Sequence, residues 1–287
     1  RFAPSPSGDL HLGSLLTAAA SYIDARAQRG RWLLRIEDLD KPREVPGAAD
    51  RIQRCLEQFG LQWDGAVIRQ SERLPLYQAA LRQMRRQGRV FRCNCSRQQL
   101  EAQRIYPGTC RRTAPDAAEP AAWRFATQAQ RVCFEDRIRG RVEQDPSREY
   151  GDFIVERRDG VIAYMLAVVV DDAAQGVTDV VRGADLLDCT AAQIQLQQAL
   201  GLPTPRYAHV PLLVEPDGNK LAKSRRSAAV AYGDTVARIR ELLELLGLDP
   251  PAALAEASPQ ECWRWASEHW RLAFLTKIQQ ISLQNRG

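Results

Sequence analysis

Two short polar motifs that could bind phosphate lie far apart in the chain. His11 follows a Gly-Asp turn at the expected start of a helix, where free backbone amides and the helix dipole attract an anion. Lys220 and Lys223 stand in a late polar loop and make up half of the chain's four lysines. A compact ammonium on a flexible stem suits a mobile phosphate better than a rigid guanidinium does. Together the motifs predict a polyphosphate site, although His11 by itself fits an ordinary helix start equally well.

The residues around His11 are typical of a parallel α/β sheet. Apolar residues at helical spacing run from Leu12 to Ile23, and Gly30 ends this pattern. A short buried strand is then expected at 32–36, followed by helices at about 46–59 and 75–87. A strand, a helix and a second strand at this spacing begin a Rossmann-like sheet.

This alternation is interrupted in the middle of the chain. The sequence from 90 to about 160 is irregular, with clustered cysteines, several prolines and many arginines, which is typical of an insertion. Regular periodicity resumes at Val161. We predict a Rossmann-like parallel sheet that is split by an inserted α+β segment and followed by a small helical region. The expected bounds are 1–88 and 161–224 for the two halves of the sheet domain, 89–160 for the insertion and 225–287 for the helical region.

Charge and composition restrict the kind of partner. The net charge is +5, and the stretch 82–158 alone carries 17 arginines against ten acidic residues. An anionic partner such as RNA would explain this, and so would a solvated arginine-rich surface. Seven cysteines favour a reduced cytoplasmic protein, and no apolar run approaches the ~20 residues of a membrane span. We expect a monomer without membrane contact, in which Trp263, Trp265 and Trp270 pack between helices.

Four motifs follow one another along the chain: Pro4–Gly8, His11–Ser14, Arg35–Asp38 and Lys220–Ser224. In this order they resemble the class I aminoacyl-tRNA synthetases of the glutamyl type, and the similarity extends over the whole chain. The resemblance implies that ATP activates L-glutamate to glutamyl-adenylate, with Mg²⁺ arriving bound to the ATP, and that the glutamate then passes to a tRNA. The residues that it implies for ATP are His11, Gly13, Ser14 and Lys223, and those that hold the phosphates in catalysis are His11, Lys220 and Lys223.

The resemblance also implies a pocket for glutamate. Its expected residues are Arg1, Ala3, Ser5, Glu37, Tyr164 and Arg182. The chemistry agrees, because a dicarboxylate with one ammonium needs cations for its carboxylates and a carboxylate for its amine. Arg182, at the end of a strand, is expected to bind the side-chain carboxylate. A structural salt bridge is the alternative role for this arginine.

Two positions depart from the pattern of the wider class. Ser14 stands where many members have a second histidine, and Ala222 replaces a serine in the lysine loop. The first change is common in the glutamyl subgroup, whereas the second removes a hydroxyl donor to phosphate. We therefore expect a slower but still active enzyme.

Three cysteines and a tyrosine of the expected insertion could hold zinc. Cys93, Cys95 and Cys110 supply three thiolates within a short loop-rich stretch, and tetrahedral zinc requires a fourth ligand. In the family resembled here a tyrosine fills that place, which implies Tyr106. Cys133 as the fourth ligand and an empty, degenerate site are the alternatives. A bound zinc would be structural, because it would fix an insertion that has little core of its own.

The acceptor of the glutamate is inferred from a different observation. The chain stops soon after the helical segment that follows Ser224, whereas a full glutamyl enzyme carries a further anticodon-binding region. This resembles a short subgroup that transfers glutamate to queuosine in the anticodon loop of tRNA(Asp), and Arg35–Glu44 resembles that subgroup as well. A truncated glutamate-tRNA ligase that charges a tRNA 3′ end is one alternative. A catalytically silent tRNA-binding paralogue is another, against which the intact His11, Glu37 and lysine pair argue.

Overall fold

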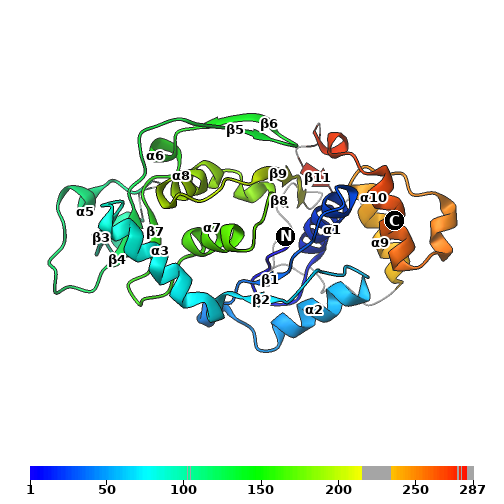
Figure 1. Cartoon of the computed structure of the whole chain (residues 1–287), viewed down its shortest axis with the longest axis horizontal. Helices are drawn as coiled ribbons and strands as arrows, with labels where there is room; N and C mark the ends of the chain where they lie inside the picture. Colours follow the sequence, from blue (N-terminus) through cyan, green and yellow to red (C-terminus); the bar gives the residue numbers. More distant parts are fainter. Residues whose placement is uncertain (102, 104, 215–233, 277, 279, 283–287) are drawn as a thin grey trace.

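The computed structural model describes residues 1–101, 103, 105–214, 234–276, 278 and 280–282 of the 287-residue chain. The α-helices of these residues are α1 (Leu12–Ala27), α2 (Ala48–Gln58), α3 (Leu74–Arg86), α4 (Arg97–Leu100), α5 (Thr109–Arg112), α6 (Pro146–Glu149), α7 (Tyr164–Ala174), α8 (Thr190–Leu200), α9 (Thr235–Leu245) and α10 (Pro259–His269). The strands are β1 (Arg35–Ile36), β2 (Ile68–Arg69), β3 (Val90–Cys93), β4 (Ala122–Phe125), β5 (Val132–Asp136), β6 (Gly140–Gln144), β7 (Phe153–Glu156), β8 (Asp179–Gly183), β9 (Arg206–Val210), β10 (Leu212–Val214) and β11 (Gln280–Ser282). Figure 1 shows β3, β4 and β7 at one end of the long axis and α9 and α10 at the other.

The first parallel unit forms around the N-terminal segment. The amide of Phe2 donates to the carbonyl of Leu33 (2.9 Å), and the amide of Arg35 donates to the carbonyl of Phe2 (3.0 Å). β1 also pairs in parallel with β2. Between these segments the chain forms α1, which buries Leu15 and Leu16 in the main core. The expected order of strand, helix and strand is therefore present, and it brings the residues before α1 beside β1.

The second parallel unit is a four-stranded sheet with the order β6-β5-β9-β8. β8 and β9 pair in parallel along their whole length, and β5 pairs with β9 where Asp136 lies opposite Tyr207. β5 and β6 form an antiparallel hairpin, which runs along the upper side of Figure 1. By sequence this hairpin falls inside the segment 89–160 that we expected as an insertion. Residues 132–144 thus return to the Rossmann-like part of the molecule.

The remainder of the expected insertion builds a separate antiparallel sheet, β3-β4-β7. Phe125 of β4 and Phe153 of β7 have their ring centroids 5.3 Å apart. They share one core with Leu81 and Met84 of α3 and with Leu166 of α7. This sheet therefore relies on helices of the Rossmann-like part for much of its burial. The domain bounds themselves stay a prediction.

Helix α7 is largely apolar and is buried along most of its length. Its residues from Met165 to Asp172 are all buried, including the two acids at the end of this run, Asp171 and Asp172. α7 contacts α3, α8 and β7. Among the described residues, no helix combines the length and the apolar character that crossing a membrane requires.

The C-terminal helices pack on the first parallel unit. Trp263 and Trp270 of this region are buried, and their ring nitrogens donate to the carbonyl of Phe59 (2.7 Å) and to Asp24 (3.2 Å). The predicted packing role of these two tryptophans is confirmed. It is also confirmed for the half-buried Trp265, which packs against the main core and stacks on His269. We expected only helix in this region. Residues 280–282 instead form β11, because the edge of β10 offers backbone hydrogen-bonding groups that a strand can pair with.

Candidate active site

Two adjoining cavities collect most of the predicted site residues. The first has a volume of about 350 Å³ and is lined by Ser5, Glu37 and Tyr164. The second has a volume of about 260 Å³, and Ser5 lines it too. Its other predicted residues are Ala3, His11, Gly13 and Ser14. The residues expected for glutamate and those expected for ATP therefore meet at Ser5, as the attack of a carboxylate on a phosphate would require.

His11 caps the N-terminus of α1. The amide of Ser14 donates to Nδ1 of His11 (3.2 Å), and the Ser14 hydroxyl lies 2.9 Å from Nε2. A Cβ at Gly13 would lie 3.3 Å from two atoms of the imidazole ring, so glycine lets the ring lie close to the backbone. The predicted place of His11 at a helix start is confirmed. The ring lines the second cavity together with the first turn of α1, where a helix attracts anions.

The lysine loop, with Lys220 and Lys223, lies outside the described residues. The strand that leads toward it, β10, does belong to the site. Leu212 and Leu213 of β10 line the second cavity beside His11. A Cβ at Gly13 would also meet Leu213, at 3.8 Å. The roles of the two lysines stay a prediction.

Glu37 follows β1 and carries an unsatisfied buried oxygen. Among the described residues, none makes a hydrogen bond to its Oε1, and the nearest cation is Arg35 at 3.7 Å. Burial raises the pKa of Glu37, although Arg35 and Arg1 oppose this. A buried acceptor without a donor costs free energy unless a ligand completes it. An ammonium in the first cavity would do so.

Arg1 is bound by a carboxylate that sequence reasoning missed. Its Nε and Nη2 donate to the two oxygens of Asp172, at 3.0 and 3.1 Å. Arg35, which is fully buried, also donates to Asp172 (2.8 Å). Burial would raise the pKa of Asp172, but these two arginines hold it far below its usual range. Arg1 is therefore paired with a carboxylate of the protein before any substrate arrives, and it shares that carboxylate with Arg35.

The neighbouring acid, Asp171, extends this buried network. It accepts hydrogen bonds from Gln70 (2.9 Å), Arg73 (2.6 Å) and Tyr77 (2.7 Å). Burial and the hydrogen bond to Asp171 raise the pKa of Tyr77 well above its usual range, so the phenol keeps its proton. One signal of this network was present in the sequence. Two adjacent acids at the end of an apolar helical run must be buried, and buried acids need cationic or hydrogen-bonding partners.

Arg182 lies at the end of β8 and is held only by neutral groups. Its guanidinium donates to Gln193 (2.8 Å), Thr190 (2.8 Å), the carbonyl of Leu186 (3.3 Å) and Nε2 of His209 (3.1 Å). Its exposed fraction is 3%. Within the described part of the chain, no carboxylate forms an ion pair with it. The alternative role of a structural salt bridge therefore has no partner among those residues.

Tyr164 lies within the electrostatic reach of the other charged residues predicted for the pocket. Burial raises its pKa to about 12, while Arg182 and Arg1 lower this value and Glu37 raises it. The phenol is therefore neutral at physiological pH and can donate a hydrogen bond. Arg1 and Arg182 line neither of the two cavities, and the structure relates them to the pocket through their electrostatic interaction with Tyr164. Whether all these residues contact glutamate stays a prediction.

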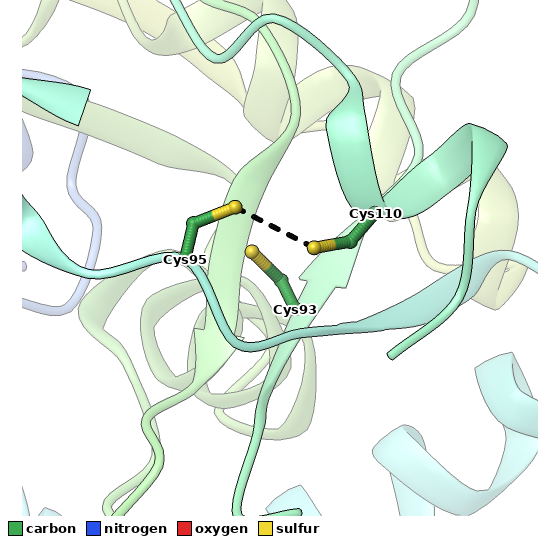
Figure 2. Close-up of side chains that lie close together, drawn as sticks. All are labelled: Cys93, Cys95 and Cys110. Atoms are coloured by element: carbon green, nitrogen blue, oxygen red, sulfur yellow. Dashed lines mark hydrogen bonds between the residues drawn. The ribbon is translucent and has the colours of Figure 1, made fainter. Parts of the chain in front are cut away.

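The cysteine cluster lies where β3 ends, far from these cavities along the chain. Figure 2 shows the sulfur atoms of Cys93, Cys95 and Cys110 pointing toward one another, and all three lie within 4.8 Å of each other. The hydroxyl of Tyr106 lies 3.5 Å from Cys93 Sγ and 3.8 Å from Cys95 Sγ. It also accepts a hydrogen bond from the amide of Cys110 (2.8 Å). Three thiols and a phenol around one point are a donor set that zinc accepts.

Hydrogen bonding favours a thiolate at Cys93. Burial would raise the pKa of Cys93, but its hydrogen bonds with Tyr106 and Arg124 lower it to about 7. The guanidinium of Arg124 also lies 4.1 Å from the centroid of the Tyr106 ring. Cys133 is exposed on β5, in a different sheet, and it is outside the cluster formed by the other three cysteines. Of the two proposed fourth ligands, the geometry therefore favours Tyr106.

Taken together, the site offers a buried cation and an unsatisfied carboxylate near a cavity that continues to a helix N-terminus. The family model of the catalytic domain of class I tRNA synthetases specific for glutamate and glutamine (E and Q) matches residues 1–253. The chain therefore belongs to this family of tRNA synthetases.

The relatives within this family include several of one kind. A glutamyl-Q tRNA(Asp) synthetase from Pseudomonas aeruginosa is 55% identical over 271 residues, which cover 94% of this chain and 92% of that protein. The protein of the same name from Thiobacillus denitrificans is 52% identical, with 95% of this chain and 93% of that protein covered. The similarity thus extends over nearly the full length of both sequences.

Solved structures of glutamate-specific enzymes share the fold. A glutamate tRNA ligase from Elizabethkingia meningosepticum, in complex with its amino acid, matches with a TM-score of 0.82 at 25% identity. The glutamate-tRNA synthetase from Elizabethkingia anophelis matches with a TM-score of 0.83, also at 25% identity. Each match covers 99% of this chain but only 66% and 68% of those chains. The predicted Rossmann-like fold with its insertion is confirmed by these matches.

Proposed function

We propose that this chain uses ATP to activate L-glutamate as glutamyl-adenylate and transfers the glutamate to queuosine in the anticodon loop of tRNA(Asp). Relatives with that tRNA in their names support the acceptor, at 50–55% identity over nearly the whole chain. The structural observation that supports glutamate as the amino acid is the environment of Arg182. This arginine is a buried cation that donates to neutral acceptors. A side-chain carboxylate would neutralise this charge, and the free oxygen of Glu37 would receive the ammonium.

Activation in this site depends on positioning and charge. The α-carboxylate of glutamate attacks the α-phosphorus of ATP, a new C–O–P linkage forms, and pyrophosphate leaves. His11 and the first turn of α1 line the cavity for the phosphates. Mg²⁺ would enter with the ATP and neutralise part of its charge. Such a step needs no nucleophilic side chain, because alignment and electrostatic stabilisation lower its barrier.

Lys223, assisted by Lys220, completes the proposed phosphate site. β10, which lines the second cavity with Leu212 and Leu213, comes immediately before the segment with both lysines in the sequence. A lysine ammonium can follow the departing pyrophosphate because its stem is flexible. Gly13 and Ser14 complete the ATP contacts in this proposal.

We further propose a structural zinc ion bound by Cys93, Cys95, Tyr106 and Cys110. Support comes from the convergence of the three sulfur atoms and from the nearby phenol. The ion would tie the end of β3 to α5, and its thiolate ligands would need the reducing conditions of the cytoplasm. Metal analysis of protein purified without chelator or added zinc tests this site. About one zinc per chain is expected, and the absence of stoichiometric zinc would overturn the assignment.

Contact with tRNA is proposed to be electrostatic and to involve the arginine-rich segment 89–160 and the C-terminal helices. The expected consequence is affinity that falls steeply as salt concentration rises. Binding that is insensitive to salt would contradict it. We propose that a single chain suffices for this contact and for catalysis.

One experiment separates the proposed acceptor from the main alternative. Glutamate-dependent exchange of pyrophosphate into ATP is first measured without tRNA. Labelled glutamate is then offered with queuosine-containing tRNA(Asp), with unmodified tRNA(Asp) and with tRNA(Glu). Transfer to the queuosine-containing tRNA alone is the expected result.

A truncated ligase that charges the 3′ end of a tRNA is the second candidate. The fold match to a glutamate tRNA ligase favours it. The two candidate activities share the activation step and differ in the acceptor. Transfer only to tRNA(Glu) would establish this alternative and overturn the proposed acceptor. A lack of exchange under every condition would instead favour a silent paralogue.

A further inference from the structure

His209 on β9 and Asp136 on β5 form a buried pair behind Arg182. The exposed fractions of His209 and Asp136 are 0% and 3%. Nδ1 of His209 lies 2.6 Å from Oδ2 of Asp136, and Nε of Arg182 lies 3.1 Å from Nε2 of His209. The Nε–H of an arginine can only donate, so Nε2 of the histidine accepts and its proton is on Nδ1. The hydrogen bonds therefore run in one direction, from Arg182 to His209 and from His209 to Asp136.

The surroundings of this pair favour one distribution of charge. Oδ1 of Asp136 accepts hydrogen bonds from the amides of Ile138 (3.0 Å) and Arg139 (2.8 Å). Although burial opposes ionisation, these amides and His209 hold the pKa of Asp136 below its usual range. Burial also lowers the pKa of His209, and the positive charge of Arg182 contributes to this. A neutral imidazole thus separates an ionised carboxylate from the guanidinium.

We propose that His209 and Asp136 are positioning residues for Arg182 in glutamate recognition. Asp136 fixes the Nδ1–H tautomer of His209, and Nε2 of His209 then orients the guanidinium without neutralising it. A carboxylate in the place of the imidazole would pair with Arg182 and compete with the substrate, as Asp172 pairs with Arg1. The inference rests on the proposed activation of glutamate, and it assigns to two buried residues a part in the choice of amino acid.

The count of donors shows what this arrangement leaves for a ligand. A guanidinium has five N–H groups. Nε donates to His209, Nη1 to Gln193, and Nη2 to Thr190 and Leu186. One N–H of Nη1 has no acceptor among these four contacts, and in our proposal a substrate oxygen accepts from it. Rotation of the guanidinium would exchange this group for another, so the contact at Nε determines which donor is free.

Two substitutions of His209 separate the bond to Arg182 from the bond to Asp136. In His209→Gln the amide oxygen can take the place of Nε2 and accept from Arg182. In His209→Asn the shorter amide can still donate to Asp136 but cannot reach Arg182. The control is Gln195→Ala. Gln195 lies on the same helix as Thr190 and Gln193, and the substitution removes its buried hydrogen bonds to the backbone of Gln128. Among the described residues, Gln195 forms no hydrogen bond with Arg182, so this variant reports general destabilisation.

Full-length variants are compared by ATP–pyrophosphate exchange and thermal unfolding. Because a hydrogen bond to a charged group is lost, the KM for glutamate in His209→Asn should rise about tenfold or more. The KM for ATP should stay within about twofold, and His209→Gln should retain a KM for glutamate within about threefold of wild type. Asp136→Asn should resemble His209→Asn. Equal KM values for glutamate in the Asn variant, the Gln variant and the wild type would overturn the proposal, as would a parallel rise in the KM for ATP or the same effect in Gln195→Ala.

Nitrogen NMR of His209 distinguishes failure of this proposal from failure of the proposed function. In the wild-type protein without substrate, Nδ1 should carry the proton and Nε2 should not, and Asp136→Asn should remove this preference. A proton on Nε2 in the wild type would overturn the positioning role even in an enzyme that activates glutamate. If the wild type carries the expected tautomer but activates another amino acid, the proposed function and the inference that rests on it are both overturned.

Discussion

Two buried arginines, Arg1 and Arg182, were expected to serve the same substrate, and the structure surrounds them differently. Arg1 makes a two-point ion pair with Asp172, which also binds Arg35. Arg182 contacts two side-chain oxygens, one carbonyl and one imidazole nitrogen, all of them neutral. The first arginine already has a carboxylate partner within the protein. The second retains a charge that a ligand can use.

This difference offers a way to interpret buried arginines in general. A buried ion pair is costly to break, because removal of one partner leaves the other charged and desolvated. An arginine that is buried among neutral acceptors has its geometry fixed without having its charge cancelled. For Arg1 and Arg182, the partners are therefore more informative than the exposed fractions, which are low for both side chains.

The largest effect is expected for Arg182→Gln. Of the two arginines, Arg182 is the one without a carboxylate partner. Its loss should lower kcat/KM for glutamate activation about a thousandfold, or ~4 kcal/mol. The thermal midpoint should fall less than the activity does, because removal of a buried charge that has no carboxylate partner offsets part of the cost of the hydrogen bonds that are lost. Pyrophosphate exchange and a melting curve on the same preparation measure both quantities. Wild-type kcat/KM in this variant would remove the distinction between the two arginines.

Asp172→Asn should affect stability more than activity. The substitution leaves Arg1 and Arg35 buried without their shared carboxylate, which should lower the free energy of unfolding by about 3 kcal/mol. Urea denaturation followed by fluorescence measures this loss. The KM for glutamate should rise less than it does in Arg182→Gln. An unchanged urea midpoint would show that this pair does not stabilise the fold.

Glu37→Gln tests the group expected to bind the ammonium. The amide keeps the shape of the side chain but lacks the charge, so the KM for glutamate should rise about a hundredfold, or ~2.7 kcal/mol. Stability should not fall, because the wild-type side chain holds a buried oxygen without a donor. Steady-state kinetics with glutamate as the varied substrate, together with urea denaturation, measures both. A normal KM combined with lower stability would make Glu37 structural and break the proposed division of roles.

The smallest effect is expected in the acid dependence of stability. The folded state holds the pKa of Asp172 below its unfolded value, so its contribution is present above pH ~4 and is lost as pH falls. One extra proton bound by the unfolded chain gives a slope of ~1.4 kcal/mol per pH unit in that range. Unfolding free energies measured with urea from pH 5 to 3 should begin to fall below pH ~4 in the wild type, and this fall should be shallower in Asp172→Asn. Parallel curves would place the linked proton on another group.

Local features of the site could be predicted from the sequence because they depend on local spacing. The turn before His11 and the apolar periodicity after it determine where α1 begins. The short separation of Cys93 and Cys95 already restricts their sulfur atoms to one end of a strand, and Cys110 follows closely enough to join them. Both features required no knowledge of distant partners.

Features that depend on distant pairing could not be predicted in this way. Arg1 and Asp172 come from opposite parts of the chain, so an identical local sequence could place Arg1 in a pocket or in an ion pair. The return of β5 to β9 has the same origin, because an alternating hairpin does not specify which edge it joins. β11 was missed since three residues carry too little periodicity to indicate a strand.

The strand order β6-β5-β9-β8 has a consequence for how the chain folds. β9 lies between two strands that both precede it in sequence, and it carries His209. Asp136 and Arg182 are therefore made before the residue that joins them, and this part of the sheet cannot close until Arg206–Val210 have left the ribosome. Such non-local closure slows folding, because the loops must be ordered before the contacts that stabilise them can form. The residue that orients the arginine is thus also carried by the strand that closes the sheet last.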